Sequence, residues 1–197
     1  MTDKGAKKNV VVVGGGSAGT LAARTLSKQL NASQYNLILV TARPFYVHMI
    51  AMARIAVTDE EKLEDKALFG YDKLFYNGNG SVKVGKVTAI HETAAGKGGE
   101  VELENGERIP YAALVLATGN SWPETIELPS TESDAKSHIS SWRDKYKNAQ
   151  HVVIVGGGAV GIGESRALIR DVSSLTRARR ACGRDSPNIP GKSLCAP

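Results

Sequence analysis

Two glycine clusters of identical spacing place the strongest constraint on how this chain can fold. The first is Gly14-Gly15-Gly16-Ser17-Ala18-Gly19, and the second is Gly156-Gly157-Gly158-Ala159-Val160-Gly161. Each follows a short apolar run, at residues 9–13 and 151–155, and such a run predicts a buried parallel strand. A glycine turn that joins a strand to a helix is typical of a dinucleotide-binding unit, so two of them predict an α/β protein with two nucleotide sites.

The residues after the first cluster complete a βαβ unit. Residues 17–30 carry apolar side chains at helical spacing, and residues 36–40 form a second apolar run. In this setting Gly14 is expected to allow the tight turn, Gly16 to let the backbone approach a pyrophosphate, and Gly19 to let helix and strand pack closely. The N-terminus of the helix would then offer free N–H groups to the phosphates.

One expected residue of this unit is missing. An acidic side chain usually ends the second strand and binds the ribose hydroxyls, but this chain has Thr41 there, followed by Ala42 and Arg43. A threonine hydroxyl can still bond to ribose, whereas a nearby arginine can favour a 2′-phosphate. The sequence therefore predicts the site but leaves the identity of its nucleotide open.

The middle of the chain predicts a meander followed by a connection. Residues 49–57 favour a short helix, and residues 81–90 alternate like one half-exposed strand. Residues 101–103 and 108–109 flank an Asn-Gly hairpin turn and so indicate an antiparallel β-meander. Residues 113–117 form a further apolar strand that leads into Thr118-Gly119, and residues 137–147 favour a helix with Trp142 and Tyr146 on one face.

Charge and composition exclude several kinds of site. The net charge is +5, but residues 162–197 hold seven basic and three acidic residues, so the rest of the chain is nearly neutral. We therefore expect no nucleic-acid partner, although an arginine-rich arm remains the alternative for this tail. Neither the two cysteines nor the four histidines show metal-ligand spacing, and no catalytic nucleophile is predicted; these residues are Cys182, Cys195, His48, His91, His138 and His151.

Two further runs narrow the class of protein. Leu114-Val115-Leu116-Ala117-Thr118-Gly119 lies between the clusters, and the run from Leu39 to His48 is followed by Ala51 and Arg54. Over residues 9–161 the chain resembles the apoptosis-inducing-factor-like and ferroptosis-suppressor-like FAD-dependent pyridine nucleotide oxidoreductases, and more distantly the type II NADH dehydrogenases. The resemblance implies a two-dinucleotide-binding-domain flavoprotein fold, with a Rossmann-like parallel sheet, an antiparallel β-meander and an incomplete second domain.

The same resemblance implies a set of cofactor contacts. The FAD pyrophosphate would lie on the first cluster, the adenosine ribose near the end of the second strand, and NAD(P)H on the second cluster. Arg54 would reach the flavin phosphates or ring, and Val87 would bond the adenine through its backbone. The alternative for Arg54 is an ordinary solvent-exposed charge on a helix, and the alternative for Val87 is a strand residue that contacts no cofactor. The implied contacts are Gly14, Gly16, Ser17, Ala18, Gly19, Thr41, Ala42, Arg43, Arg54, Val87, Thr118, Gly119, Gly156, Gly158 and Gly161.

The implied chemistry needs no catalytic side chain. Hydride would pass from NAD(P)H to FAD and then to a quinone or another acceptor. The chain has no Cys-x-x-Cys pair, which argues against the disulfide-reductase branch. Residues 1–8 are polar and basic, and the apolar run at residues 10–13 is too short for a signal-peptide core. The expected location is therefore cytoplasmic, with a mitochondrial one as the alternative and peripheral membrane contact allowed. The sequence predicts no oligomeric state.

The resemblance ends after Gly161, where the chain continues Ile162-Gly163-Glu164-Ser165-Arg166. We expect an FAD-binding unit at residues 1–125, a connection at 126–150, the start of an NAD(P)H-binding βα unit at 151–170, and a disordered basic tail at 171–197. On this plan the chain is truncated within the NAD(P)H-binding domain. Two functions are therefore kept open, an FAD-dependent NAD(P)H oxidoreductase and a non-catalytic nucleotide-binding fragment of one.

Overall fold

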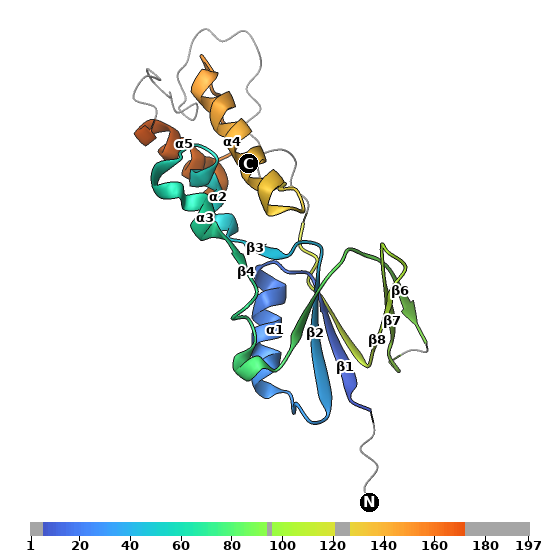
Figure 1. The fold of residues 1–197 in the computed structure, drawn as a ribbon. Helices are drawn as coiled ribbons and strands as arrows, with labels where there is room; N and C mark the ends of the chain where they lie inside the picture. The colour runs from blue at the N-terminus through green and yellow to red at the C-terminus, as the bar shows by residue number, and fades with distance from the viewer. Residues whose placement is uncertain (1–5, 94–95, 121–126, 172–197) are drawn as a thin grey trace, which may run out of the picture.

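A four-stranded parallel sheet lies at the centre of the protein (Figure 1). The computed structural model describes residues 6–93, 96–120 and 127–171. The strand order is β5 (Ser81–Val84), β2 (Tyr35–Thr41), β1 (Lys8–Val13) and β9 (Ala113–Leu116), and each neighbouring pair is parallel. Helix α1 (Ser17–Gln29) joins β1 to β2, which confirms the predicted βαβ unit.

The order of the strands creates a switch point beside β1. The chain passes from β1 to β2 and β5 on one side and later returns to form β9 on the other side. Val13, the last residue of β1, pairs with Leu116, the last residue of β9. Ligands of open α/β sheets bind at the carboxyl ends of the strands at such a point, so this edge is the first place to look for a site.

Both faces of the sheet are covered. Residues Val10, Val12, Leu37 and Leu39 pack with Ala23 of α1 on one face. On the other face the sheet packs against the predicted antiparallel meander, which consists of β6 (Val87–Glu92), β7 (Gly99–Leu103) and β8 (Arg108–Tyr111). The β-branched strands are therefore buried on both sides, as their continuous apolar sequence requires.

The prediction of one strand over residues 81–90 is wrong. The segment is two strands, because β5 belongs to the parallel sheet and β6 to the meander. The chain turns between them at Gly85, whose backbone N–H donates to the Thr41 carbonyl at 2.8 Å. A side chain at Gly85 would lie 2.9 Å from the Leu103 side chain, so the turn runs close to the meander.

A layer of helices lies beyond the carboxyl ends of the strands (Figure 1). An antiparallel ribbon of β3 (Phe45–Val47) and β4 (Leu68–Gly70) leads to it, and a short 3-10 turn, η2 (Tyr76–Gly78), packs by α1. The predicted helices over residues 49–57 and 137–147 are confirmed, the latter with Trp142 and Tyr146 rings 6.1 Å apart. The layer consists of α2 (Met49–Ile55), η1 (Glu60–Lys62), α3 (Leu63–Ala67), α4 (Glu132–Asn148) and α5 (Ala159–Asp171).

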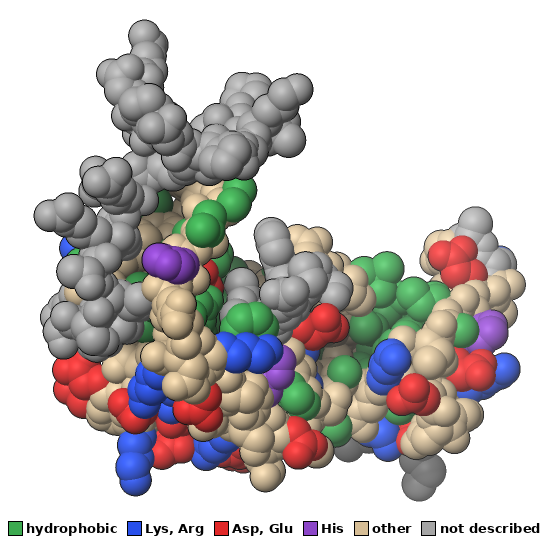
Figure 2. All heavy atoms as spheres, turned by 90° about the horizontal axis from the view of Figure 1, so that it is seen from above, with side chains coloured by type: hydrophobic (Ala, Val, Ile, Leu, Met, Phe, Trp, Pro, Cys, Tyr) green, Lys and Arg blue, Asp and Glu red, His purple; other side chains and the backbone are tan. Residues whose placement is uncertain are grey.

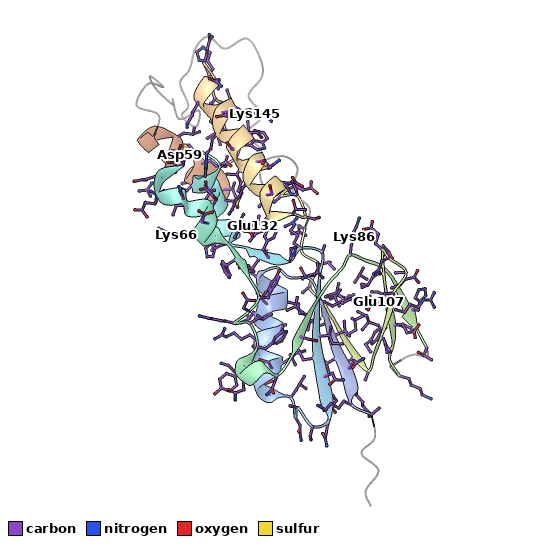
Figure 3. The ribbon with its side chains drawn as sticks, in the orientation of Figure 1. Asp59, Lys66, Lys86, Glu107, Glu132 and Lys145 are labelled. Atoms are coloured by element: carbon purple, nitrogen blue, oxygen red, sulfur yellow. The ribbon has the colours of Figure 1, made fainter. Side chains whose placement is uncertain are left out.

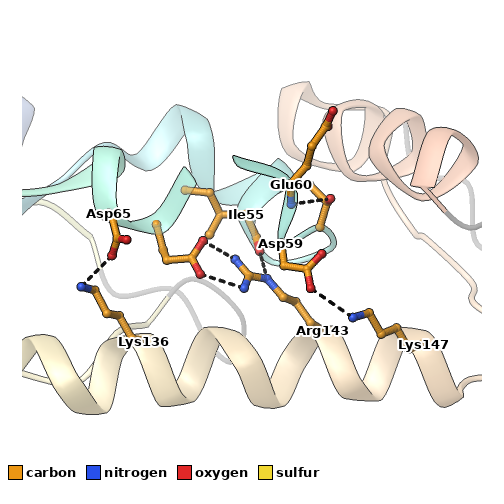
Figure 4. Close-up of polar contacts among 9 residues, drawn as sticks. Ile55, Asp59, Glu60, Asp65, Lys136, Arg143 and Lys147 are labelled. Carbon is orange, nitrogen blue, oxygen red and sulfur yellow. Dashed lines mark hydrogen bonds and ion pairs between the residues drawn. The ribbon is translucent and has the colours of Figure 1, made fainter. Parts of the chain in front are cut away.

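A buried arginine ties this helical layer together (Figure 4). The Arg143 guanidinium on α4 donates to both carboxylate oxygens of Glu64 on α3, at 3.0 and 2.7 Å, and its Nε donates to the Ile55 carbonyl at 2.8 Å. This bidentate pairing holds the pKa of Glu64 below its ordinary value. One side chain thus satisfies the end of α2 and the start of α3 together.

The predicted strand at residues 151–155 is wrong. Residues 151–157 form no regular secondary structure, and Val153 and Val155 are 81% and 86% exposed. Within the described residues no strand lies alongside to complete a ladder, so the apolar run stays unpaired. The predicted tail lies outside the described residues from 172 onward, and the proposed domain boundaries stay predictions.

Replacing Arg143 with alanine should destabilise the helical layer. The change leaves a half-buried Glu64 carboxylate and the Ile55 carbonyl without their partner, so we expect a loss of about 3 kcal/mol in the free energy of unfolding. Urea unfolding followed by circular dichroism measures it. The control is Lys147→Ala, which removes an exposed ion pair with Asp59 and should cost less than about 1 kcal/mol. Equal losses in the two variants would contradict the role given to Arg143.

The contribution of Glu64 should depend on pH. Because its folded-state pKa is lowered by Arg143, the stabilisation is complete above the ordinary value of 4.5 and is lost as the pH falls through the lowered value. The stability gap between the wild-type protein and Glu64→Gln should therefore narrow on going from pH 7 to pH 3. Urea midpoints at each pH measure that gap, and a constant gap would show that ionised Glu64 contributes nothing.

Candidate dinucleotide-binding site

The first glycine loop lies at the carboxyl end of β1, against the turn that follows β9. Gly14 has φ +115°, and a side chain on it would lie 2.1 Å from the Ala117 carbonyl oxygen. The Ala117 N–H donates in turn to the Val13 carbonyl at 2.8 Å. The fold therefore brings the first cluster and the predicted Ala-Thr-Gly turn together, so that Thr118 and Gly119 follow directly on this contact.

The other two fingerprint glycines occupy contrasting environments. A side chain on Gly19 would lie 1.8 Å from the Gly14 carbonyl, so α1 crosses β1 too closely for any other residue. Gly16 caps α1, and nothing lies within 4 Å of where its Cβ would be. Gly16, Ser17 and Ala18 are all exposed. Close packing on one side and open space at the helix N-terminus are what a bound pyrophosphate requires.

The second cluster repeats this backbone. Gly156 also has φ +115°, a side chain on Gly161 would lie 2.4 Å from the Gly156 carbonyl, and α5 begins at the fourth residue of the cluster, as α1 does. The three glycines from 156 to 158 have open space around them. The cluster lies in the helical layer, where Gly163 of α5 approaches Ala53 of α2 (Figure 1).

The end of β2 differs from the expected ribose site. The Thr41 side chain is buried, and its hydroxyl donates to the Arg43 carbonyl at 3.1 Å. Ala42 is exposed and Arg43 half-buried, so these two residues present the accessible surface at this strand end. Thr41 is thus engaged within the protein, and a ribose contact through its hydroxyl remains a prediction.

Tyr71 is the residue of this site that the sequence did not reveal. Its hydroxyl lies 3.0 Å from the Gly15 carbonyl, 3.1 Å from the Phe45 carbonyl and 3.4 Å from the Thr41 hydroxyl. Burial raises the pKa of this phenol, so it keeps its proton near neutrality. Tyr71 falls within residues 43–80, where no periodic pattern singles out any one side chain.

Comparison with known proteins identifies the family of this fold. The sequence pattern of the pyridine nucleotide-disulphide oxidoreductases matches residues 8–185. The chain belongs to this family. The resemblance stated from the two glycine clusters and the Ala-Thr-Gly run is thereby confirmed.

Curated members of the oxidoreductase family extend the comparison. An FAD-dependent oxidoreductase of Flammulina velutipes is 42% identical over 59% of the chain and 35% of its own length. Ferroptosis suppressor protein 1 of Taeniopygia guttata is 34% identical over 78% of the chain, and apoptosis-inducing factor homolog B of Dictyostelium discoideum is 31% identical over the same share; 38% and 37% of their lengths are covered. The chain thus spans little more than a third of these relatives.

Solved structures of oxidoreductases share the fold. A NAD-dependent persulfide reductase from A. fulgidus superposes with a TM-score of 0.57 at 22% identity, over 82% of this chain and 32% of its own. The sulfide:quinone oxidoreductase of Aquifex aeolicus gives 0.52 at 24% identity, over 72% and 33%. The Rossmann-like α/β architecture predicted from the sequence is therefore confirmed.

The remaining two predicted contacts, Arg54 and Val87, lie in different layers. Arg54 on α2 is half-exposed and forms an ion pair with Glu60 in the helical layer. Val87 begins β6 and packs against the core between sheet and meander. The Lys86–Glu104 and Lys83–Glu107 ion pairs join the segment before Val87 to the loop between β7 and β8, and Figure 3 labels Lys86 and Glu107 in this region. The fold thus brings Val87, but not Arg54, near the end of β2.

Figure 2 looks down on the edge where these turns lie and shows hydrophobic side chains between the helical layer and the meander. Leu116, the last residue of β9, is 59% exposed. Across the described residues, no cluster of three or more metal-ligating side chains occurs. In the same part of the chain, none of the helices has the length and apolarity needed to cross a bilayer.

Replacing Gly16 or Gly19 with alanine should distinguish the glycine needed for FAD binding from the glycine needed for stability. Gly16→Ala places a methyl group in open space, so stability should hold while FAD affinity falls about tenfold. Gly19→Ala forces α1 away from Gly14 and should cost about 2–3 kcal/mol of stability. Thermal unfolding of the apoprotein and fluorescence titration with FAD measure the two effects. Full FAD affinity in Gly16→Ala would show that the pyrophosphate lies elsewhere.

Proposed function

We propose that the chain carries the nucleotide-binding core of an FAD-dependent NAD(P)H oxidoreductase, with FAD at the first glycine cluster and NAD(P)H at the second. One observation carries the proposal: the same backbone turn is built twice in one chain, with φ +115° at both Gly14 and Gly156. Two nucleotide sites suit an enzyme in which one cofactor passes electrons to another.

The residues present fit the FAD end of the proposal. Gly14 and Gly19 bring α1 and the turn after β9 against β1, while Gly16 and the N-terminus of α1 face open space for the pyrophosphate. Ala42 is exposed and Arg43 half-buried after β2, and we propose that these two residues lie beside the adenosine ribose. When bound, FAD would accept hydride from NAD(P)H and pass the electrons on. The protein's part is to bind and orient, and we assign no side chain as catalytic.

The electron acceptor is proposed only by class. A quinone is supported by the shared fold with a sulfide:quinone oxidoreductase, whose name states its own acceptor. We also propose a cytoplasmic location, with a mitochondrial one as the alternative. Peripheral contact with a membrane is a further proposal. No nucleic-acid partner is proposed.

A second candidate function follows from a specific observation. The segment before the second cluster is unpaired, with Val153 and Val155 exposed, whereas β1 before the first cluster is paired on both sides. Among the described residues, the second loop thus lacks the sheet that fixes the first. This favours a nucleotide-binding fragment that takes FAD at the first loop without turnover.

The visible absorption spectrum of the purified protein should decide between the oxidoreductase and the non-catalytic nucleotide-binding fragment. For an oxidoreductase we expect a flavin spectrum that bleaches when NADH or NADPH is added without oxygen. A flavin spectrum that persists after both additions would support the nucleotide-binding fragment. A protein that stays colourless after incubation with FAD would overturn both, since each requires FAD at the first cluster.

A further inference from the structure

The Tyr71 hydroxyl links three segments that meet at the first glycine loop. It lies within hydrogen-bonding distance of Gly15 in the loop, of Phe45 at the start of β3 and of Thr41 at the end of β2. A phenol carries one proton, so the Gly15 and Phe45 carbonyls share it, while the Thr41 hydroxyl donates to Arg43. Tyr71 is the donor that this part of the loop depends on.

The fit of Gly15 shows how tight this contact is. A side chain on Gly15 would lie 2.2 Å from the Tyr71 hydroxyl oxygen and 2.3 Å from the Thr41 hydroxyl oxygen. The fingerprint itself demands glycine at Gly14, Gly16 and Gly19 but not at the position between the first two. The Thr41–Tyr71 pair therefore explains why this chain has a third glycine in the loop.

Holding the Gly15 carbonyl also fixes the neighbouring donor. In a trans peptide the C=O of one residue and the N–H of the next point in opposite directions. The Gly15 carbonyl accepts from the Tyr71 hydroxyl, so the Gly16 N–H points away from Tyr71, and Gly16 itself is exposed. That is where the pyrophosphate of the proposed function would accept a hydrogen bond.

We propose that Tyr71 is a positioning residue of the dinucleotide site, whose hydroxyl orients the Gly15–Gly16 peptide so that the Gly16 N–H donates to the pyrophosphate. The inference rests on the proposed binding of FAD at the first cluster. Tyr71 acts through the loop and touches no cofactor itself. Its effect should be the same for any ligand that carries the ADP moiety.

Tyr71→Phe removes the hydroxyl and keeps the ring. One hydrogen bond contributes about 1 kcal/mol, so the Kd values for FAD and for ADP should rise by the same factor, roughly fivefold. Tyr76→Phe is the matched control, because Tyr76 is 52% exposed and its ring contacts Lys28, away from the loop. Titration calorimetry with FAD and with ADP measures both constants for each variant.

A second readout reports on the loop itself. In the ¹H–¹⁵N spectrum of wild-type protein, the Gly16 amide resonance should shift downfield when ADP binds, and this shift should shrink in Tyr71→Phe. A merely structural effect would lower the unfolding midpoint without changing the shift at saturating ADP. If Tyr71→Phe folds poorly, Gly15→Ala serves as the second variant. Its methyl group displaces the Tyr71 hydroxyl, so it should lower the affinity for FAD and ADP in the same way.

The outcomes separate this inference from the proposed function. Wild-type binding of FAD and ADP, with unchanged Kd values and Gly16 shift in Tyr71→Phe, would overturn the role of Tyr71 and leave the proposed function standing. Absence of FAD and ADP binding in the wild-type protein would overturn both. Parallel loss of FAD and ADP affinity, with Tyr76→Phe unchanged, is the result that supports the role.

Discussion

The close approach of three backbone segments at the end of β1 is the constraint on which the rest of the structure depends. Gly14 lies against the Ala117 carbonyl, and Gly19 of α1 lies against the Gly14 carbonyl. Any side chain at these positions would separate α1, β1 and β9, whose mutual packing covers the centre of the sheet. The same proximity leaves the Gly16 end of α1 open, so one arrangement of glycines both closes the core and leaves room for an anionic ligand.

The helical layer is organised by a different interaction. Arg143 joins α4 to the end of α2 and to α3 through one guanidinium, within an apolar cluster that includes Met52, Ile55 and Ile139. Helix α5, which carries the second glycine cluster, packs on α2 and so depends on this layer rather than on the sheet. The two clusters therefore share a local backbone but have different structural support.

Local patterns could be predicted from the sequence, and long-range pairings could not. The βαβ unit, the meander and the roles of Gly14 and Gly19 follow from spacing and from the steric needs of a tight turn. The prediction of a strand over residues 151–155 was wrong because an apolar run favours extended backbone but does not specify a neighbouring strand to pair with. The turn at Gly85 is bonded to Thr41, more than forty residues earlier in the chain, and Tyr71 makes its contacts with residues 26 to 56 positions away, so neither feature shows as a local pattern.

The pairing of β1 with β9 has a consequence for how the protein folds. Val10 and Ala113 are neighbours in the sheet although more than a hundred residues of chain separate them. Closing a loop of that length costs on the order of 4 kcal/mol in chain entropy, whereas β1, α1 and β2 can assemble from contiguous sequence. The glycine turn is therefore local in contact order, whereas its contact with Ala117 is not. A ligand that touches both segments would stabilise the β1–β9 pairing, which joins the strands of this sheet that are farthest apart in the sequence.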